Sequence, residues 1–177
     1  MRIIGGTLKG KTIMPPAGYA ARPTTDFAKE GLFNILNNQV NFEDTVLLDL
    51  FSGTGSISAE FASRGAREIV SVEMNPSNAR FISQTARSLG IRSMRVVKHN
   101  VFDFLEICTK KFNLIFADPP YALDGFDTIP NKVLDADILE DGGLFILEHS
   151  AANNFEQHPL FVKERKYGNV HFSFFQK

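Results

Sequence analysis

The sequence has little cysteine, no long apolar run and almost no net charge, and each of these absences narrows the choice of protein class. Cys108 is the only cysteine among 177 residues, which excludes a disulfide framework and fits a reducing cytoplasm. No apolar run approaches the length of a membrane span, and residues 1–6 show no signal-peptide pattern. The four histidines are not spaced as metal ligands, either with one another or with Cys108. We therefore expect a cytoplasmic protein that binds no metal and no membrane.

Charge is distributed unevenly, although the net charge is only −1. Residues 1–30 carry five basic side chains against two acidic ones, whereas the rest of the chain carries 14 against 18. A basic arm on a mildly acidic body favours contact with a polyanion at one place. The alternative is an ordinary solvated hairpin. The candidate contacts are Arg2, Lys9, Lys11, Arg22 and Lys29.

The first 40 residues differ in pattern from the remainder. They predict an N-terminal extension in which a short hairpin (2–5 and 8–14) is followed by a loop and by a helix near 25–37. Residues 41–177 form the main domain in this prediction, and nothing in the sequence requires more than a monomer.

From about residue 45 onward, strand patterns alternate with helix patterns. Such alternation predicts an α/β fold with a mostly parallel sheet and helices on both faces. A closing antiparallel hairpin around Gly168-Asn169 brings the sheet to seven strands. The expected strands are 45–51, 69–73, 94–98, 113–117, 143–148, 162–167 and 170–175. The expected helices are 56–64, 76–89, 101–109 and 126–139.

Residues 46–55 read VLLDLFSGTG, an apolar run that leads into small residues. With the helical pattern behind it, this predicts a strand, a Gly-rich turn and a helix. Gly53 and Gly55 let the backbone approach a ligand closely. A dinucleotide site would hold a pyrophosphate there and would have glycine where Ser58 stands. Asp49 would repel a pyrophosphate but attract S-adenosylmethionine, which carries an ammonium and a sulfonium, so the motif favours this methyl donor over NAD.

Two further strand ends point to the same crevice, because parallel sheets bind ligands beyond the carboxyl ends of their strands. Glu73 stands twenty positions after Gly53, where an acid binds ribose hydroxyls, although it also fits a solvated strand-end acid. Asn100 follows the strand 94–98 and can read the adenine edge, or simply cap the next helix. The candidate cofactor-binding residues are Asp49, Phe51, Gly53, Gly55, Glu73, Met74, Asn100 and Val101.

The most informative segment is Asp-Pro-Pro-Tyr at 118–121, which follows the apolar run 114–117. Prolines fix φ and donate no backbone hydrogen bond, and they hold the preceding residue extended. The result is a stiff ledge with a carboxylate before it and an aromatic ring after it, which suits a planar base with an exocyclic amine. A tight turn after a buried strand is the plainer interpretation. The candidate catalytic residues are Asp118, Pro119, Pro120 and Tyr121.

Five segments together resemble the RsmD family of bacterial ribosomal RNA guanine-N2 methyltransferases. They are RIIGGTLKGK at 2–11, RPTTDFAKEGLFNIL at 22–36, LDLFSGTGSISAEFASRGA at 48–66, ADPPY at 117–121 and the hairpin around 167–168. The first two are the more specific, since many methyltransferases share the glycine turn and Asp-Pro-Pro-Tyr. The resemblance implies a Rossmann-like class I methyltransferase fold, S-adenosylmethionine as donor, and one guanine of 16S rRNA as target. It also implies a small ribosomal subunit, or its assembly intermediate, as partner.

One departure from that family pattern concerns the helix near residues 25–37. The pattern continues after Asp26 with two arginines, whereas this chain has Phe27 and Lys29. The helix therefore brings one positive charge fewer to the RNA.

The residues at the ledge suggest a mechanism. Acceptors for both N–H groups localise the lone pair of the guanine N2 amine, and Asp118 and the Pro119 carbonyl are the candidates. Transfer is then direct, with Asp118 as proton acceptor and Tyr121 stacking on an unstacked base. Glu148, at the end of the strand expected over 143–148, can face the base-binding pocket or be a structural acid. We expect a structural acid.

Three other functions remain open on the sequence. A DNA or RNA amino-methyltransferase acting on adenine N6 or cytosine N4 would use the same chemistry. A ribosome-assembly factor that binds S-adenosylmethionine without catalysis would keep the same fold. An NAD-binding module is disfavoured by Asp49 and Ser58.

Overall fold

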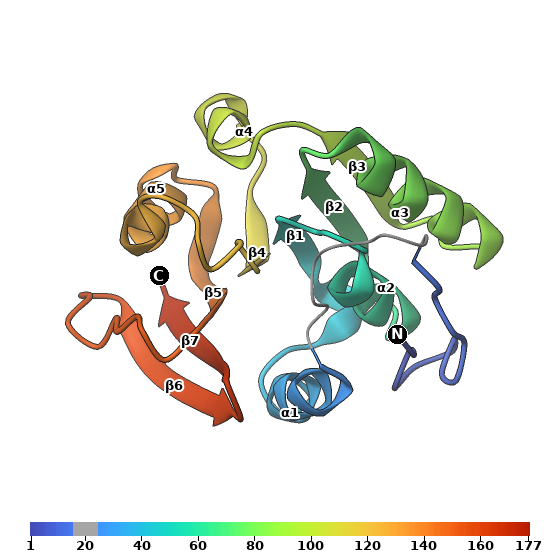
Figure 1. Cartoon of the computed structure of the whole chain (residues 1–177), viewed down its shortest axis with the longest axis horizontal. Helices are drawn as coiled ribbons and strands as arrows, with labels where there is room; N and C mark the ends of the chain where they lie inside the picture. Colours follow the sequence, from blue (N-terminus) through green and yellow to red (C-terminus); the bar gives the residue numbers. More distant parts are fainter. Residues whose placement is uncertain (16–24) are drawn as a thin grey trace.

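The chain folds around one seven-stranded sheet, shown in Figure 1. The computed structural model describes residues 1–15 and 25–177. The strand order is β3-β2-β1-β4-β5-β7-β6, and β7 alone runs antiparallel to the other strands. The strands are β1 (Val46–Leu50), β2 (Glu68–Glu73), β3 (Met94–Lys98), β4 (Phe112–Ala117), β5 (Leu139–His149), β6 (Phe161–Tyr167) and β7 (Val170–Gln176). The helices are α1 (Asp26–Leu36), α2 (Ser56–Ser63), α3 (Pro76–Ser88), α4 (Val101–Ile107) and α5 (Ile129–Asp135), with short 3₁₀ turns at Phe42–Asp44 and Phe126–Thr128.

Two apolar cores lie on the two faces of the sheet. One contains Leu32 of α1 and Phe61 of α2, which pack with Phe116 and Phe172 of the strands. The other contains residues of α4 and α5 and the opposite side chains of the same strands. Because the central strands are covered on both faces, β1 is buried along its whole length. These findings confirm the predicted α/β architecture, a mostly parallel seven-stranded sheet with a C-terminal antiparallel hairpin and helices on both faces.

The predicted elements differ from the structure mainly at their ends. Strand β5 begins at Leu139 rather than near 143, and the helix expected over 126–139 is a 3₁₀ turn followed by the short α5. The expected N-terminal hairpin has a single bridge, between Arg2 and Thr12. No helix in the described parts of the chain is long and apolar enough to cross a membrane.

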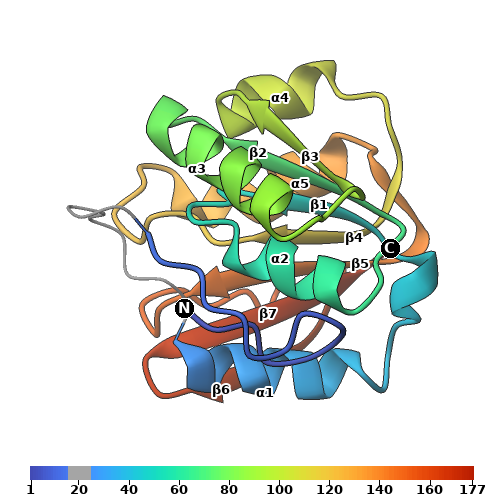
Figure 2. The ribbon, with the colours of Figure 1, turned by 90° about the vertical axis from the view of Figure 1, so that its right-hand side faces the viewer.

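The N-terminal segment, residues 1–15, owes its position to α2 rather than to a ladder of its own (Figure 2). The buried carboxylate of Glu60 accepts the backbone N–H groups of Ile4 at 2.9 Å and Gly5 at 2.8 Å. Gly6 has a φ of 72°, and a Cβ there would lie 1.9 Å from the carbonyl oxygen of Ser63. A side chain at this position would therefore push the segment off the helix.

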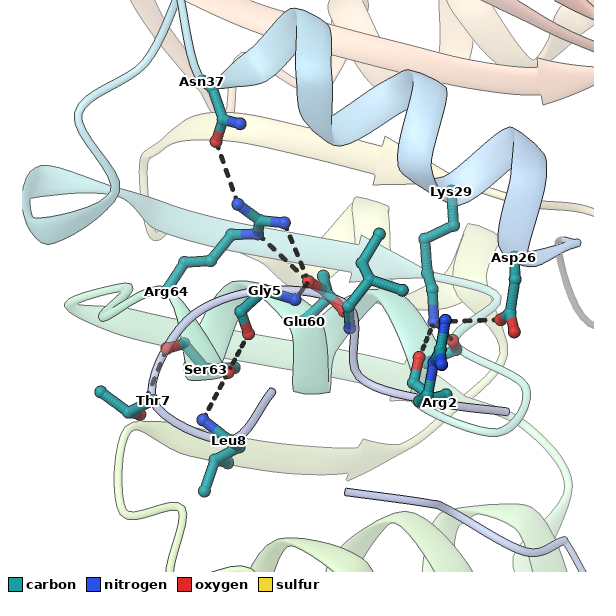
Figure 3. A network of polar contacts seen from close by, with 12 residues as sticks. Arg2, Gly5, Thr7, Leu8, Asp26, Lys29, Asn37, Glu60, Ser63 and Arg64 are labelled. Carbon is teal, nitrogen blue, oxygen red and sulfur yellow. Dashed lines mark hydrogen bonds and ion pairs between the residues drawn. The ribbon is translucent and has the colours of Figure 1, made fainter. Parts of the chain in front are cut away.

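The basic side chains near this segment complete the attachment, as Figure 3 shows. Arg64 pairs with Glu60 at 3.0 Å, and its guanidinium lies over the ring of Phe33. Lys29 of α1 donates to the Arg2 carbonyl at 2.7 Å and to the Ser56 hydroxyl at 3.3 Å. Since Ser56 is the first residue of α2, this network joins the N-terminal segment to the glycine turn.

The division of the chain into an N-terminal extension (1–40) and a main domain (41–177) stays a prediction.

Candidate active site

The register of the sheet gathers three acids at the carboxyl ends of β1, β4 and β5. Leu50 of β1 lies opposite Ala117 of β4, which lies opposite Leu147 of β5. Asp118 and Glu148 each follow the last of these pairs, so they are neighbours across adjacent strands. Asp49 comes one residue before Leu50 in β1 and lies opposite Phe116 of β4. Because side chains alternate along a strand, all three acids project to the face that α1 and α2 cover.

Asp49 is 1% exposed and lies under the glycine turn. The Ser58 hydroxyl donates to its Oδ2 at 2.5 Å and lies 2.7 Å from the hydroxyl of Ser71. Burial raises the pKa of Asp49 to about 7, against the effect of the hydrogen bond from Ser58. A bound cation would favour the ionised form. The site can therefore hold a cationic ligand and release a proton as it does so.

The turn after β1 uses unusual backbone angles. Phe51 has a φ of 58°, which is rare for a residue with a side chain. Gly53 and Gly55 follow with φ values of 56° and 73°. A Cβ on Gly55 would lie 3.0 Å from Ile82 of α3. The turn is therefore held close to α3, and its strained residue marks it as a functional segment.

The Glu73 carboxylate is engaged at this turn rather than solvated. Its Oε2 accepts the Gly53 N–H at 2.8 Å, and its Oε1 accepts the Asn75 N–H at 2.7 Å. Only 9% of the residue is exposed. The structure thus brings Glu73 to the glycine turn as expected and shows that it also shapes the turn.

Met74, Asn100 and Val101 lie along the rim beyond β2 and β3. The Asn100 side-chain oxygen caps α4 by accepting from Phe102 at 2.8 Å, and its amide nitrogen lies 3.7 Å from the Met74 sulfur. Asn100 therefore caps α4, as the plainer interpretation expects, and its contact with adenine stays a prediction. Met74 is 63% exposed. Val101 is buried in the core, so it has its backbone rather than its side chain to offer to a ligand.

Asp-Pro-Pro-Tyr follows β4 directly and leads into a turn. The Asp118 N–H is bonded to Leu50 across the sheet at 3.3 Å, and the Pro120 carbonyl accepts the Leu123 N–H at 2.9 Å. The turn therefore uses the Pro120 carbonyl, which leaves Pro119 as the candidate acceptor for a base. Burial, and then the nearby carboxylates of Glu148 and Asp49, raise the pKa of Asp118 well above its usual value.

Tyr121 and Glu148 lie near Asp118 at the carboxyl ends of β4 and β5. Tyr121 is 48% exposed, so part of the residue is open to a ligand. Burial and the carboxylates of Glu148 and Asp118 raise the pKa of the Tyr121 hydroxyl. Glu148 is only 3% exposed. Glu148 thus lies beside Asp118 near the end of β5, and whether it is a structural acid or faces a ligand stays open.

The predicted polyanion contacts separate into two groups. Arg2, Lys9 and Lys11 are exposed on the N-terminal segment. The prediction for Lys29 is wrong, because this residue is 1% exposed and its ammonium is used inside the protein. Burial lowers the pKa of the Lys29 ammonium, and the nearby carboxylates of Glu60 and Asp26 oppose part of this effect. Arg22 lies outside the described residues.

The structure also brings together polar side chains that sequence spacing had not connected. His149 of β5, Glu164 of β6 and His171 of β7 offer ligand atoms within 4.8 Å of one another, an arrangement that can hold a metal ion. The His149 ring nitrogens lie 2.8 Å from the Ser150 carbonyl and 2.8 Å from the Ser173 hydroxyl. His171 lies 2.9 Å from Glu164. Protein hydrogen bonds thus already engage both ring nitrogens of His149 and the Nδ1 of His171. The absence of a metal stays a prediction.

Comparison with known proteins places this geometry in a family. A family model described as Conserved hypothetical protein 95 matches residues 1–176. Ribosomal RNA small subunit methyltransferase D of Escherichia coli K12 is 29% identical, over 100% of this chain and 90% of the relative. A putative rRNA methyltransferase of Bacillus subtilis is 29% identical, over 84% of this chain and 82% of that protein.

Solved structures give the same result. A hypothetical protein of Thermus thermophilus superposes with a TM-score of 0.88 at 30% identity, covering 100% of this chain and 99% of the other. A putative methyltransferase of Escherichia coli superposes with a TM-score of 0.88 at 28% identity, covering 100% and 97%. The acids, the glycine turn and the proline ledge occupy the strand ends where this fold binds its ligand. The chain therefore belongs to the Conserved hypothetical protein 95 family, the RsmD family that its sequence resembles, and is an S-adenosylmethionine-dependent methyltransferase.

Proposed function

We propose that this protein transfers a methyl group from S-adenosylmethionine to the exocyclic N2 amine of one guanine in 16S rRNA. The observation that carries the proposal is the row of acids at the ends of β1, β4 and β5, with the proline ledge beside it. We also infer that the protein acts as a monomer in the cytoplasm. Its partner in this proposal is the small ribosomal subunit or an assembly intermediate of it.

The residues at the strand ends fit the methyl donor. Asp49 supplies a buried carboxyl whose ionised form a nearby cation would favour, and Gly53 and Gly55 put no side chain at their two positions of the turn. In this proposal Glu73 binds the ribose hydroxyls and Asn100 the adenine edge, with Phe51, Met74 and the Val101 backbone around them. When bound, the donor supplies an electrophilic methyl group on sulfur.

The remaining residues of the pocket hold the base. Asp118 accepts from the N2 amine, and a charge-assisted bond of this kind is the stronger type. The Pro119 carbonyl is the candidate for the second N–H, with Pro120 keeping the ledge rigid. The ring of Tyr121 stacks on the base, which must leave its stack to reach the pocket. Asp118 then takes the surplus proton of the amine, and its raised pKa suits it to that task.

RNA binding is assigned to the exposed basic residues of the N-terminal extension, residues 1–40. Arg2, Lys9 and Lys11 carry this proposal within the described residues, and Arg22 is retained from the sequence. Lys29 is removed from the set, since it holds the Arg2 backbone from inside. Phosphate contacts of this kind should make affinity depend on salt.

The test is mass mapping of modified nucleosides in 16S rRNA from cells with and without the protein. We expect one N2-methylguanosine to disappear with the gene and to return when purified protein and S-adenosylmethionine are added. Methylation of adenine or cytosine, or of duplex DNA instead of ribosomal RNA, would replace the proposed substrate. A complete lack of methylation would favour the non-catalytic assembly factor.

A further inference from the structure

Glu148 is set apart from the other acids by its place in the sheet. β4 pairs with β5 through Ala117 and Leu147, so Asp118 and Glu148 follow on adjacent strands, whose spacing is about 4.8 Å. With 3% exposure, Glu148 is among the most buried acids of the described residues. A carboxyl held next to another carboxyl at a strand end is costly to maintain, which indicates a role beyond folding.

The order of the acids across the sheet gives that role a direction. β4 lies between β1 and β5, so Asp118 stands between Asp49 and Glu148. Asp49 belongs to the methyl-donor side, and the amine that receives the methyl group must lie next to it, at Asp118. The rest of the base edge then extends toward β5. Glu148 is therefore the acid that the ring atoms beyond the amine would meet.

Tyr121 adds a second link to the same place. A hydrogen bond to Glu148 and the charges of Glu148 and Asp118 contribute to the raised pKa of the Tyr121 hydroxyl. The side chain that would stack on the base is thus joined to the acid that would meet its edge. Both belong to one recognition unit on the β5 side of the pocket.

Resting on the proposed function, we propose that Glu148 is a specificity-determining residue that pairs with the N1–H and O6 of the target guanine while Asp118 accepts from N2. The two neighbouring carboxyls share a proton, because each disfavours ionisation of the other. A protonated Glu148 accepts from N1–H through its carbonyl oxygen and donates its hydroxyl hydrogen to O6. Adenine and cytosine have a ring acceptor next to their amine and lack this pair of groups.

The test replaces the target guanine in 16S rRNA by 2-aminopurine, which keeps the N2 amine but has no N1–H and no O6. For the wild-type protein, kcat/KM should be roughly 10–100-fold higher with guanine than with 2-aminopurine, because guanine makes two more hydrogen bonds. Glu148→Ala should lower the value for guanine by a similar factor and change that for 2-aminopurine by less than about threefold. Glu148→Gln, whose amide can accept from N1–H and donate to O6, should restore most of the preference.

Three controls separate a role in recognition from a role in folding. Glu148→Met keeps the side-chain volume and should behave as the alanine variant does. Glu140→Ala, at an exposed position of the same strand, should change neither rate. Melting temperature and affinity for S-adenosylmethionine are measured for every variant.

The outcomes distinguish this inference from the proposed function. Equal losses on both bases in Glu148→Ala and Glu148→Met, or no loss on either, would overturn the role of Glu148 and leave the proposed function standing. Failure of the wild-type protein to methylate N2 of guanine would overturn the proposed function and the inference together.

Discussion

The acid-lined strand ends and the N-terminal attachment to α2 both depend on buried charge, yet they use it in opposite ways. At the strand ends Asp49, Asp118 and Glu148 lie near one another, and burial disfavours the ionised forms of Asp49 and Asp118. At the attachment Glu60 is matched by Arg64 and by two backbone N–H groups. The first arrangement favours a cationic ligand, whereas the second stabilises the fold. The comparison teaches that buried acids grouped with one another, rather than with bases, are the binding signal.

The largest effect should come from Asp118. Replacing it with asparagine removes the charged acceptor and the proton acceptor, and we expect kcat to fall roughly 10²–10⁴-fold. Steady-state methylation assays measure this. Asp124→Asn, an exposed acid six residues further on, is the matched control and should retain activity. Near-normal turnover by Asp118→Asn would remove the mechanism.

A change at Glu60 should affect stability instead of chemistry. Glu60→Ala leaves two N–H groups and the Arg64 guanidinium without their acceptor, which should cost about 3–5 kcal/mol of unfolding free energy. Residues 1–13 should then exchange amide hydrogens faster, as hydrogen-exchange mass spectrometry would show. Glu68→Gln removes an exposed ion pair with Lys110 and should cost less than about 1 kcal/mol. If the two variants unfold alike, the attachment is not the buried network described above.

Asp49 should show opposite effects on stability and on ligand binding. Its pKa is raised to about 7 in the folded protein, so the folded state holds a proton that the unfolded chain gives up near pH 4. The stability from this group is present below pH 4 and is lost as the pH rises to about 7. Asp49→Asn should therefore unfold at a higher temperature than wild type at pH 8, but not at pH 4. Its affinity for S-adenosylmethionine should fall about tenfold or more.

The smallest effects should come from the basic residues. Single changes of Arg2, Lys9 or Lys11 to glutamine should each lower the salt dependence of RNA binding by about one unit of slope. Lys29→Met should leave that slope unchanged and instead loosen residues 1–13. Filter binding at several salt concentrations separates the two groups. An altered slope for Lys29→Met would mean that its burial is not maintained in the RNA complex.

The strand-end site could be predicted from the sequence because its residues follow strands at fixed positions. Glu73 and Asp118 each follow an apolar run, and Asp49 lies one residue before the end of β1. The rule that the carboxyl ends of parallel strands meet at one edge of the sheet places the three acids together. The attachment could not be predicted in the same way. Lys29 has the charge and spacing of a surface residue, and only the contact with Arg2 and Ser56 places it inside. The cluster of His149, Glu164 and His171 escaped notice for the same reason, since it joins three strands.

The most direct test of the account is calorimetric titration of the protein with S-adenosylmethionine near pH 7, in two buffers that differ in ionisation enthalpy. If a cation occupies the acid-lined strand ends, binding should release roughly half a proton from Asp49, and the Asp49→Asn variant should bind more weakly and release less. Failure to bind, or tight binding with the same proton release in both proteins, would contradict the claim that these acids form the methyl-donor site.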